Sequence, residues 1–470
     1  MNKATLTCML VAIWMIASGL EAQAQGARPS VVSDAYIVKV TDGVEVDRTA
    51  RDVAALLGGR VRHVYTKGFR GFAIHVPRGV KGADLLADPR IARVEPDLTI
   101  PLPPFPVAGP SAKGGKPGKP DKGGKDQAGQ QVPTGVQRIG TLENTTANID
   151  GIDVRVDVDI AILDSGIDLS HPDLYVFAGV NCIGGCNNTE SWQDDNGHGT
   201  HVAGIAAAID NEFGVVGVAP GARLWAIKTH GDQGTATLSD ILAGINWVVE
   251  NAEEIEVANM SFGRVAVSEA WRDVIIAGVE AGVVFVAGAG NSSSDIYGPD
   301  GQFAYLDSDT ADDFIPAAFP EVAAVSAMAD SDGEAGGSRG KRRGGLEDTI
   351  VSWSNYSTDV WHENPVMCNP ITSCGAAMDL AAPGANIYST ALGGGYVTSG
   401  GTSMAAPHVT GAVALYIAAK GRANDAARVG AIRQALIDSA EHQSEWRTDG
   451  LMTDPDDWPE GLVDVGGFPP

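Results

Sequence analysis

Gly400-Gly401-Thr402-Ser403-Met404-Ala405-Ala406-Pro407-His408 is the stretch around which this 470-residue chain is organised. It opens a small and apolar run that continues to Lys420 and predicts a buried helix over Met404–Lys420. The two glycines allow a tight turn before that helix. Ser403 would then lie at the helix N-terminus, where unpaired N–H groups and the helix dipole favour negative charge. This position suits a nucleophile that attacks a carbonyl, although serine there is also a common N-terminal cap.

The N-terminal residues have the composition of a secretory signal peptide. Residues 1–24 contain Lys3, an apolar stretch from Cys8 to Ile16, and Ala22-Gln23-Ala24 as a cleavage site. The apolar stretch is shorter than the roughly 20 residues that a membrane span needs, and no other segment is long and apolar enough to cross a bilayer. We therefore predict a secreted, extracellular protein that does not act at membranes, with the periplasm as the alternative location.

Charge is distributed unevenly along the chain, whose formal net charge is -26. Residues 1–128 contain 18 Lys and Arg against 12 Asp and Glu, whereas residues 129–470 contain 15 against 47. Because residues 129–470 are so acidic, they repel nucleic acid, and we do not expect nucleic acid as a partner. The acidity either serves solubility or contributes in part to calcium binding. We expect the protein to be a monomer.

Composition and periodicity divide the rest of the chain into four parts. Residues 25–101 alternate strand and helix patterns and predict a small α+β domain of ferredoxin-like type. Residues 102–129 are rich in Pro, Gly and Lys and predict a flexible linker. Residues 130–440 alternate strands with helices, which predicts an α/β fold with a doubly wound parallel sheet and helices on both faces. Residues 441–470 are polar and are expected to wrap the surface as a C-terminal extension.

Four cysteines remain once the signal peptide is removed. Their short spacings favour two local disulfides, Cys182–Cys186 and Cys368–Cys374, in an oxidising compartment. A zinc site is the alternative, but these spacings lack the usual rhythm of zinc ligands.

Two residues with catalytic potential lie in glycine-flanked turns ahead of Ser403. Asp164 follows the predicted strand Val156–Leu163, at the carboxyl end where the sites of such folds gather. His198 begins a helix of small residues. His201, one turn later, raises the alternative of a metal pair, but neither a His-Glu-x-x-His pattern nor a third ligand is evident.

The turn Gly288-Ala289-Gly290-Asn291 follows the predicted strand Val283–Ala287. It begins like a Gly-x-Gly-x-x-Gly dinucleotide fingerprint, but Ser293 stands at the third glycine position, so we discard nucleotide binding. The Asn291 amide is instead suited to donate a hydrogen bond to an oxyanion.

Together these residues supply what acyl transfer to a serine requires. Ser403 needs His198 to take its proton, and Asp164 would hold the imidazole in the productive tautomer. The Asn291 side chain and the Ser403 N–H would donate to the oxyanion. The order Asp, His, Ser is the subtilisin order. The Gly-x-Ser-x-Gly elbow of lipases is absent, which argues against an esterase or lipase.

The chain resembles the subtilisin-like serine proteases (subtilases) over about residues 130–440. The resemblance rests on three signatures in the family's order: Asp164-Ser165-Gly166, His198-Gly199-Thr200-His201-Val202-Ala203-Gly204 and Gly401-Thr402-Ser403-Met404-Ala405-Ala406-Pro407. It implies a serine endopeptidase that hydrolyses protein and peptide substrates through an acyl-enzyme intermediate. A catalytically silent subtilase used as a binding or scaffold protein is the alternative, but its expected loss of a triad residue or of Asn291 is not observed.

The resemblance also implies a substrate cleft in which an extended peptide pairs with the edge segment Asn259–Gly263. An ordinary strand-end turn is the alternative for this segment. The loop 292–316 departs from the family's length, so the side chain preferred in the S1 pocket is not evident. Its carboxylates either favour basic side chains there or belong to a solvated loop. The two implied walls of the S1 pocket are formed by Ser261, Phe262 and Gly263 and by Gly288, Ala289 and Gly290.

A structural Ca²⁺ is implied as well, held by oxygen donors as a hard cation requires. The matching ligands are the side chains of Gln130, Asp173 and Asn211 and the carbonyls of Ile209, Phe213 and Val215. A second ion near Asp307, Asp309, Asp312 and Asp313 is suggested by charge density alone.

Residues 25–101 resemble the inhibitor-type propeptide of the same family, on Ala35-Tyr36-Ile37-Val38, Gly71-Phe72-Ala73 and Asp88–Asp97. The resemblance implies an intramolecular inhibitor that assists folding, leaves its tail in the active site and is removed by self-processing. We expect a first self-cleavage near Leu102–Pro106. The basic insertion Gly333–Gly345 is either a further self-cleavage site or a disordered loop.

Overall fold

The structure is a computed structural model that describes residues 30–105, 129–186, 192–298, 312–336, 347–357, 378–447, 455 and 459–468. The predicted signal peptide, most of the linker, Cys368, Cys374, Asp307 and Asp309 lie outside the described residues, as does most of Gly333–Gly345.

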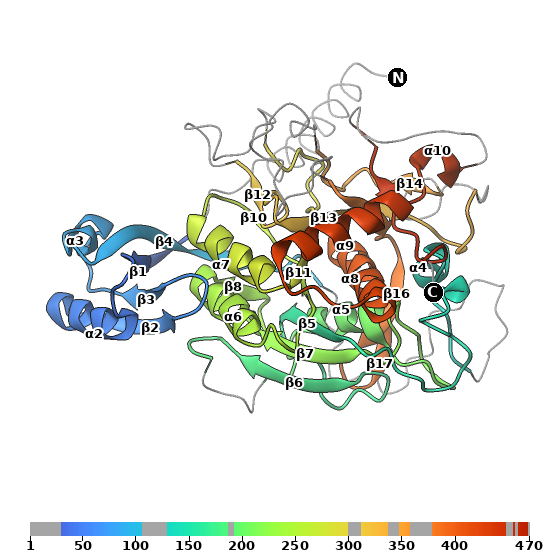
Figure 1. The fold of residues 1–470 in the computed structure, drawn as a ribbon, viewed down its shortest axis with the longest axis horizontal. Helices are drawn as coiled ribbons and strands as arrows, with labels where there is room; N and C mark the ends of the chain where they lie inside the picture. The colour runs from blue at the N-terminus through green and yellow to red at the C-terminus, as the bar shows by residue number, and fades with distance from the viewer. Residues whose placement is uncertain are drawn as a thin grey trace, which may run out of the picture. The chain divides into compact units, whose positions relative to one another are not determined.

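Residues 31–101 form an antiparallel sheet with two helices packed against it (Figure 1). The sheet order is β2-β3-β1-β4, and the alternation of strand and helix confirms the ferredoxin-like prediction. Helix α2 forms because Val46, Ala50 and Val53 recur on one buried face, and it ends at Gly58 in the left-handed conformation. The elements are β1 (Val31–Val40), α2 (Val46–Leu57), β2 (Arg60–Tyr65), β3 (Gly71–His75), α3 (Gly82–Leu86) and β4 (Ile91–Pro101).

The remainder of the described chain is built on a nine-stranded sheet of order β18-β15-β13-β11-β9-β5-β7-β6, with β14 paired to β13. Every pair along this path is parallel, and only β14 is antiparallel to its neighbour. This confirms the predicted parallel α/β sheet. The strands are β5 (Asp159–Asp164), β6 (Val176–Asn181), β7 (Arg223–Lys228), β9 (Val257–Met260), β11 (Val284–Gly288), β13 (Val322–Ala329), β14 (Thr349–Ile350), β15 (Leu380–Pro383) and β18 (Gly461–Leu462).

Helices flank this sheet, and the central one is α8 (Thr402–Lys420), which packs against five of its strands. Its residues from Thr402 to Leu415 are all buried, as expected for a helix that is apolar on every side. Gly411 allows a close approach, because a Cβ there would lie 2.5 Å from the Cβ of Val218. None of the helices in the described residues is long and apolar enough to cross a bilayer. The other main helices are α5 (His198–Ala207), α6 (Leu238–Glu250), α7 (Glu269–Glu280) and α9 (Ala426–Ser439).

Short elements complete the fold. They are α4 (Thr134–Arg138), η1 (Thr141–Glu143), β8 (Thr235–Thr237), β10 (Arg264–Val265), β12 (Phe314–Ile315), β16 (Ile387–Ala391), β17 (Gly395–Ser399) and α10 (Gln443–Trp446).

The C-terminal segment does more than wrap the surface, so that expectation is wrong for part of it. Gly461–Leu462 form β18, which extends the main sheet beside β15. Leu462, Val463 and Val465 are fully buried. These few apolar residues within a polar segment are too short a signal to predict a strand.

Candidate active site

Asp164 and His198 form a buried pair at the carboxyl end of the sheet. Asp164 is the last residue of β5, and its Oδ1 and Oδ2 lie 2.9 and 2.8 Å from Nδ1 of His198, the first residue of α5. The backbone N–H of Ser165 donates to the same carboxylate at 2.7 Å. A carboxylate at this distance favours the tautomer protonated on Nδ1, which leaves Nε2 as the basic nitrogen.

The turn that presents His198 is held by Asp194, a residue that sequence reasoning did not single out. Asp194 Oδ1 accepts the backbone N–H groups of Asn196 and Gly197, both at 2.9 Å, and Oδ2 accepts the Thr200 hydroxyl at 2.6 Å. The Ser165 hydroxyl also donates to Asp194, at 2.9 Å. One buried carboxylate therefore joins the start of α5 to the end of β5. An aspartate two residues before an Asn-Gly turn gives no local signal of this role.

Ser403 is the second residue of α8, and Gly401 occupies the cap position before the helix. The interpretation of Ser403 as a helix cap is therefore wrong. Ser403 is only 3% exposed, and its hydroxyl donates to the carbonyl oxygen of Ser261 at 2.8 Å. Nε2 of His198 has no hydrogen-bond partner within the described part of the chain.

The orientation of the Asn291 amide follows from its partner Thr402. The backbone N–H of Thr402 donates to Oδ1 of Asn291 at 2.8 Å, and the Thr402 hydroxyl lies 3.2 Å from the same oxygen. Because an N–H can only donate, this atom is the amide oxygen, and the NH₂ group remains for another acceptor. Asn355, which sequence reasoning missed, holds the turn by accepting the Ser292 N–H at 2.9 Å and donating to the Ala289 carbonyl at 2.9 Å.

Two further histidines near this pair stay neutral. Burial lowers the pKa of His201 to about 3 and that of His230 to about 4. His201 Nε2 lies 3.1 Å from the carbonyl of Val397, so this ring is engaged within the fold. The described residues contain one cluster able to offer three His, Cys, Asp or Glu ligands to a metal, and it does not include His198 or His201. That cluster consists of Asp330, Asp332 and Glu347.

A cavity beside Ser403 brings the predicted substrate-binding residues together, with one exception. Ser261, Phe262 and Gly263 line one part, and Gly288 and Gly290 line another, together with Asn291 and Ser403. Ala289 is not among the lining residues; it is fully buried, and its N–H donates to the carbonyl of Val325 at 2.9 Å.

Residues 99–105, the end of the described N-terminal segment, run beside the same cavity. Ile100 pairs with Ala236 of β8 in an antiparallel register, and the N–H of Leu102 donates to the Gly234 carbonyl at 2.7 Å. Residues 101–104 line the cavity beside Ser403. The ring of Phe105 packs edge-on against His198, with a centroid distance of 5.5 Å. The end of the N-terminal segment therefore lies across the candidate catalytic residues.

Two carboxylates of β4 cap helices of the larger part of the chain. At the start of α6, the backbone N–H and the hydroxyl of Ser239 both donate to the Asp97 carboxylate, at 3.0 and 2.6 Å. Glu95 accepts the Ser268 hydroxyl at 2.7 Å and the Ala270 N–H at 3.0 Å, at the start of α7. Helix N-termini carry unpaired N–H groups and a positive partial charge, so both carboxylates are well placed to stabilise this interface.

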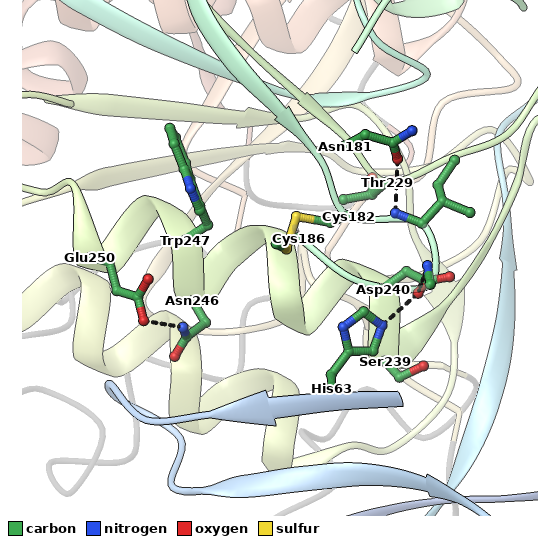
Figure 2. Close-up of a disulfide and its surroundings, with 12 residues drawn as sticks. His63, Asn181, Cys182, Cys186, Thr229, Ser239, Asp240, Asn246, Trp247 and Glu250 are labelled. Atoms are coloured by element: carbon green, nitrogen blue, oxygen red, sulfur yellow. Dashed lines mark hydrogen bonds and ion pairs between the residues drawn. A yellow bond between two sulfur atoms is a disulfide. The ribbon is translucent and has the colours of Figure 1, made fainter. Parts of the chain in front are cut away.

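Asp240 of α6 also contacts the N-terminal segment (Figure 2). His63 of β2 points toward it, with Nε2 2.7 Å from Oδ1, and Arg62 lies 3.2 Å from the same oxygen. The N–H of Gly184, inside the Cys182–Cys186 loop, also donates to Oδ1 at 2.9 Å. The two cysteines of that loop form a disulfide (Figure 2). The second predicted bridge, Cys368–Cys374, falls outside the described residues.

The predicted calcium ligands lie close together: Gln130 and Asp173 contact the loop 209–215, which carries the others. Asp173 is completely buried; its Oδ2 accepts the Val215 N–H and its Oδ1 the Asn211 side chain, both at 2.8 Å. Gln130 Oε1 accepts the Asn211 N–H at 2.6 Å, and the Ile209 N–H donates to the Asp173 carbonyl at 3.0 Å. Phe213 lies on the same loop, and its N–H donates to Oδ1 of Asn211 at 2.9 Å.

These residues fit a hard cation. Burial raises the pKa of Asp173. Nε2 of Gln130 is buried without a partner. A bound metal ion stabilises a buried carboxylate, and the surrounding amide and carbonyl oxygens are ligands that Ca²⁺ prefers.

Comparisons with known proteins agree with this geometry. The model described as "Subtilase family" matches residues 156–456. The chain is 32% identical to "Subtilisin E" of Bacillus subtilis (strain 168) over 405 residues, which cover 86% of this chain and 84% of that protein. It is 35% identical to "Subtilisin" of Bacillus pumilus over 288 residues (61% of this chain, 85% of that protein). It is 34% identical to "Subtilisin Savinase" of Lederbergia lenta over 286 residues (61% and 84%). The chain therefore belongs to the subtilase family.

Proposed function

We propose that the protein is a secreted serine endopeptidase that hydrolyses peptide bonds in proteins and is made as a self-processing zymogen. The observation that carries this proposal is the buried pair of Asp164 and His198. Nδ1 of His198 lies 2.8 Å from the Asp164 carboxylate, and Ser403 lines the neighbouring cavity. No residue required for acyl transfer is missing, which disfavours the alternative of a silent binding protein.

Each residue has a defined role in the proposed reaction. The Ser403 hydroxyl turns from the Ser261 carbonyl to Nε2 of His198, which takes its proton as Oγ attacks the substrate carbonyl. Asp164 stabilises the resulting imidazolium. The NH₂ group of Asn291 and the N–H of Ser403 donate to the oxyanion. His198 then gives the proton to the leaving amine, and water hydrolyses the acyl-enzyme by the same steps in reverse.

The segment of residues 25–101 is proposed to act as an intramolecular inhibitor. The tail across His198 and Ser403 supports this role, because a substrate cannot enter a cleft that already holds residues 101–105. The carboxylate caps of Glu95 and Asp97 would hold the segment in place until it is removed. The division into signal peptide, inhibitor, linker, catalytic part and extension is part of the same proposal, as is a monomeric state.

Ca²⁺ is proposed as a structural ion rather than a participant in the reaction. Gln130, Asp173 and Asn211 would supply side-chain oxygens, and Ile209, Phe213 and Val215 would supply carbonyls. The ion would neutralise the buried Asp173 carboxylate and fix this loop.

Hydrolysis of casein by the purified, matured protein tests the proposed function. The wild type should release peptides, while Ser403→Ala and His198→Ala, each secreted and folded to the same extent, should not. A folded wild type that is free of residues 25–101 and releases no peptides would contradict the proposal and favour the binding-protein alternative.

A further inference from the structure

We propose that Phe314 determines specificity by occupying the base of the S1 pocket, so that the enzyme prefers peptides with a small, uncharged side chain before the cleaved bond. This inference rests on the proposed function and concerns the same site. It also supplies the S1 preference that the sequence alone leaves open.

Phe314 lies between the two glycine walls of the cavity. A Cβ added to Gly263 would overlap Cε1 of its ring, and a Cβ added to Gly290 would lie 2.9 Å from Cζ. The same edge of the Phe314 ring approaches both glycines. The ring therefore fills the space between Gly263 and Gly290. Gly263, Gly290 and Phe314 all line the cavity that contains Ser403.

The backbone holds Phe314 in this position. Residues 314–315 form β12, in which Phe314 pairs with Val265 and Ile315 with Arg264 of β10. The N–H of Phe314 donates to the Ile296 carbonyl at 2.7 Å, and its carbonyl accepts the Ala318 N–H at 3.0 Å. The segment that carries the ring is therefore tied on both sides, so a substrate would not displace it easily.

The chemistry of the lining points to an uncharged side chain. None of the described residues that line this cavity carries a charge. Asp312 and Asp313, the described carboxylates next to Phe314, are not among the lining residues. The idea that carboxylates of this loop select basic side chains gains no support from these positions.

The tail that lies in the cleft is consistent with a pocket for uncharged side chains. The tail residues that line the cavity are Pro101, Leu102, Pro103 and Pro104, none of which is charged or aromatic. A large aromatic side chain would instead have to share the space between the glycine walls with Phe314. In an apolar pocket, a misfit of one or a few methylene groups changes kcat/KM by about 10- to 200-fold.

Hydrolysis of matched peptide p-nitroanilides with Ala, Phe or Lys before the cleaved bond tests this inference. Active enzyme is counted by fluorophosphonate labelling, so misfolded protein does not enter the rates. The wild type should prefer the Ala peptide to the Phe peptide by about tenfold or more in kcat/KM. Phe314→Ala should raise kcat/KM for the Phe peptide by about tenfold or more while changing the Ala peptide by less than about threefold. Phe314→Leu, which keeps an apolar contact with β10, should shift the ratio in the same direction.

Phe177→Ala provides a matched control, because Phe177 lies on β6 with 49% of its surface exposed. This variant should keep the wild-type preference. A wild type that prefers Phe or Lys, or a labelled Phe314→Ala enzyme with an unchanged ratio, would overturn the role of Phe314 alone. A wild type that is neither labelled nor active on any peptide would overturn the proposed function and this inference with it.

Discussion

The hydroxyl of Ser403 donates to the carbonyl of Ser261 at 2.8 Å, while Nε2 of His198 has no partner among the described residues. The candidate nucleophile and base are therefore uncoupled while the tail lies in the cleft. An extended substrate that paired with the segment containing Ser261 would offer its own N–H to such a carbonyl.

Proline makes the tail a poor substrate. Every peptide bond from Leu102 to Pro106 includes a proline, either as the leaving residue or before the bond. A proline leaving group carries a ring carbon where other residues carry only hydrogen on nitrogen. We expect the first self-cleavage near Leu102–Pro106, and these prolines should slow it, because proline is the leaving residue at every bond there except Pro104–Phe105.

Pro103→Ala/Pro104→Ala should therefore speed this cleavage. Intact-mass analysis of the purified precursor over time should find faster cutting between residues 102 and 105 in this variant, and no such cut when Ser403→Ala is added. Pro77→Ala/Pro89→Ala, at exposed positions of the same segment, is the control and should resemble the wild type. A variant that is cut no faster than the wild type would refute the prediction.

Asn291→Ala should lower kcat by about 10²–10³-fold with little change in KM, because the amide acts on the oxyanion rather than on the bound substrate. Steady-state kinetics of the matured enzyme measure this effect. Asn424→Ala, at an exposed position, should leave both constants unchanged. A loss of less than about tenfold would mean that Asn291 is not the oxyanion donor.

Removal of Ca²⁺ should lower the melting temperature of the protein in a Ser403→Ala background, where self-digestion is absent. When the free Ca²⁺ concentration is 100 times the dissociation constant of the site, binding contributes about 2.7 kcal/mol to the free energy of unfolding. Asp173→Asn should abolish the response to added Ca²⁺, and Asp438→Asn, at an exposed position, should preserve it. A calcium response that survives Asp173→Asn would place the ion elsewhere.

Loss of the two carboxylate caps should speed activation of the zymogen. A helix cap contributes about 1 kcal/mol, so Glu95→Ala/Asp97→Ala should weaken the hold of the inhibitor segment by about tenfold or more. The half-time for the appearance of activity in the purified precursor measures this change. Asp42→Ala, an exposed acid of the same segment, controls for the loss of charge. An unchanged half-time in the double variant would show that the caps do not limit release.

The parts of the fold that could be predicted are those with a local signal. The strand expected at Val156–Leu163 is observed at Asp159–Asp164, and the helix expected from Met404 begins at Thr402. Both are continuous apolar runs, which predict buried elements from the sequence alone. By contrast, β18 rests on two residues whose pairing with β15 is decided by distant packing.

The residues of the candidate site also divide into those with a local sequence signal and those without one. Asp164, His198 and Ser403 were identified because they stand in long signatures with an informative order. Asp194, Asn355 and Phe314 were missed because their roles arise from contacts with residues far along the chain, such as Asn355 with Ala289. The direction of the Ser403 hydroxyl also depends on what occupies the cleft, which no local pattern reveals.

Covalent labelling of the matured protein with a fluorophosphonate, followed by peptide mapping, tests the assignment of Ser403 as the nucleophile. We predict one label, on Ser403, that His198→Ala abolishes and that excess inhibitor segment suppresses. A folded protein free of residues 25–101 that takes no label, or takes it on another serine, would contradict the assignment of Ser403 as the nucleophile.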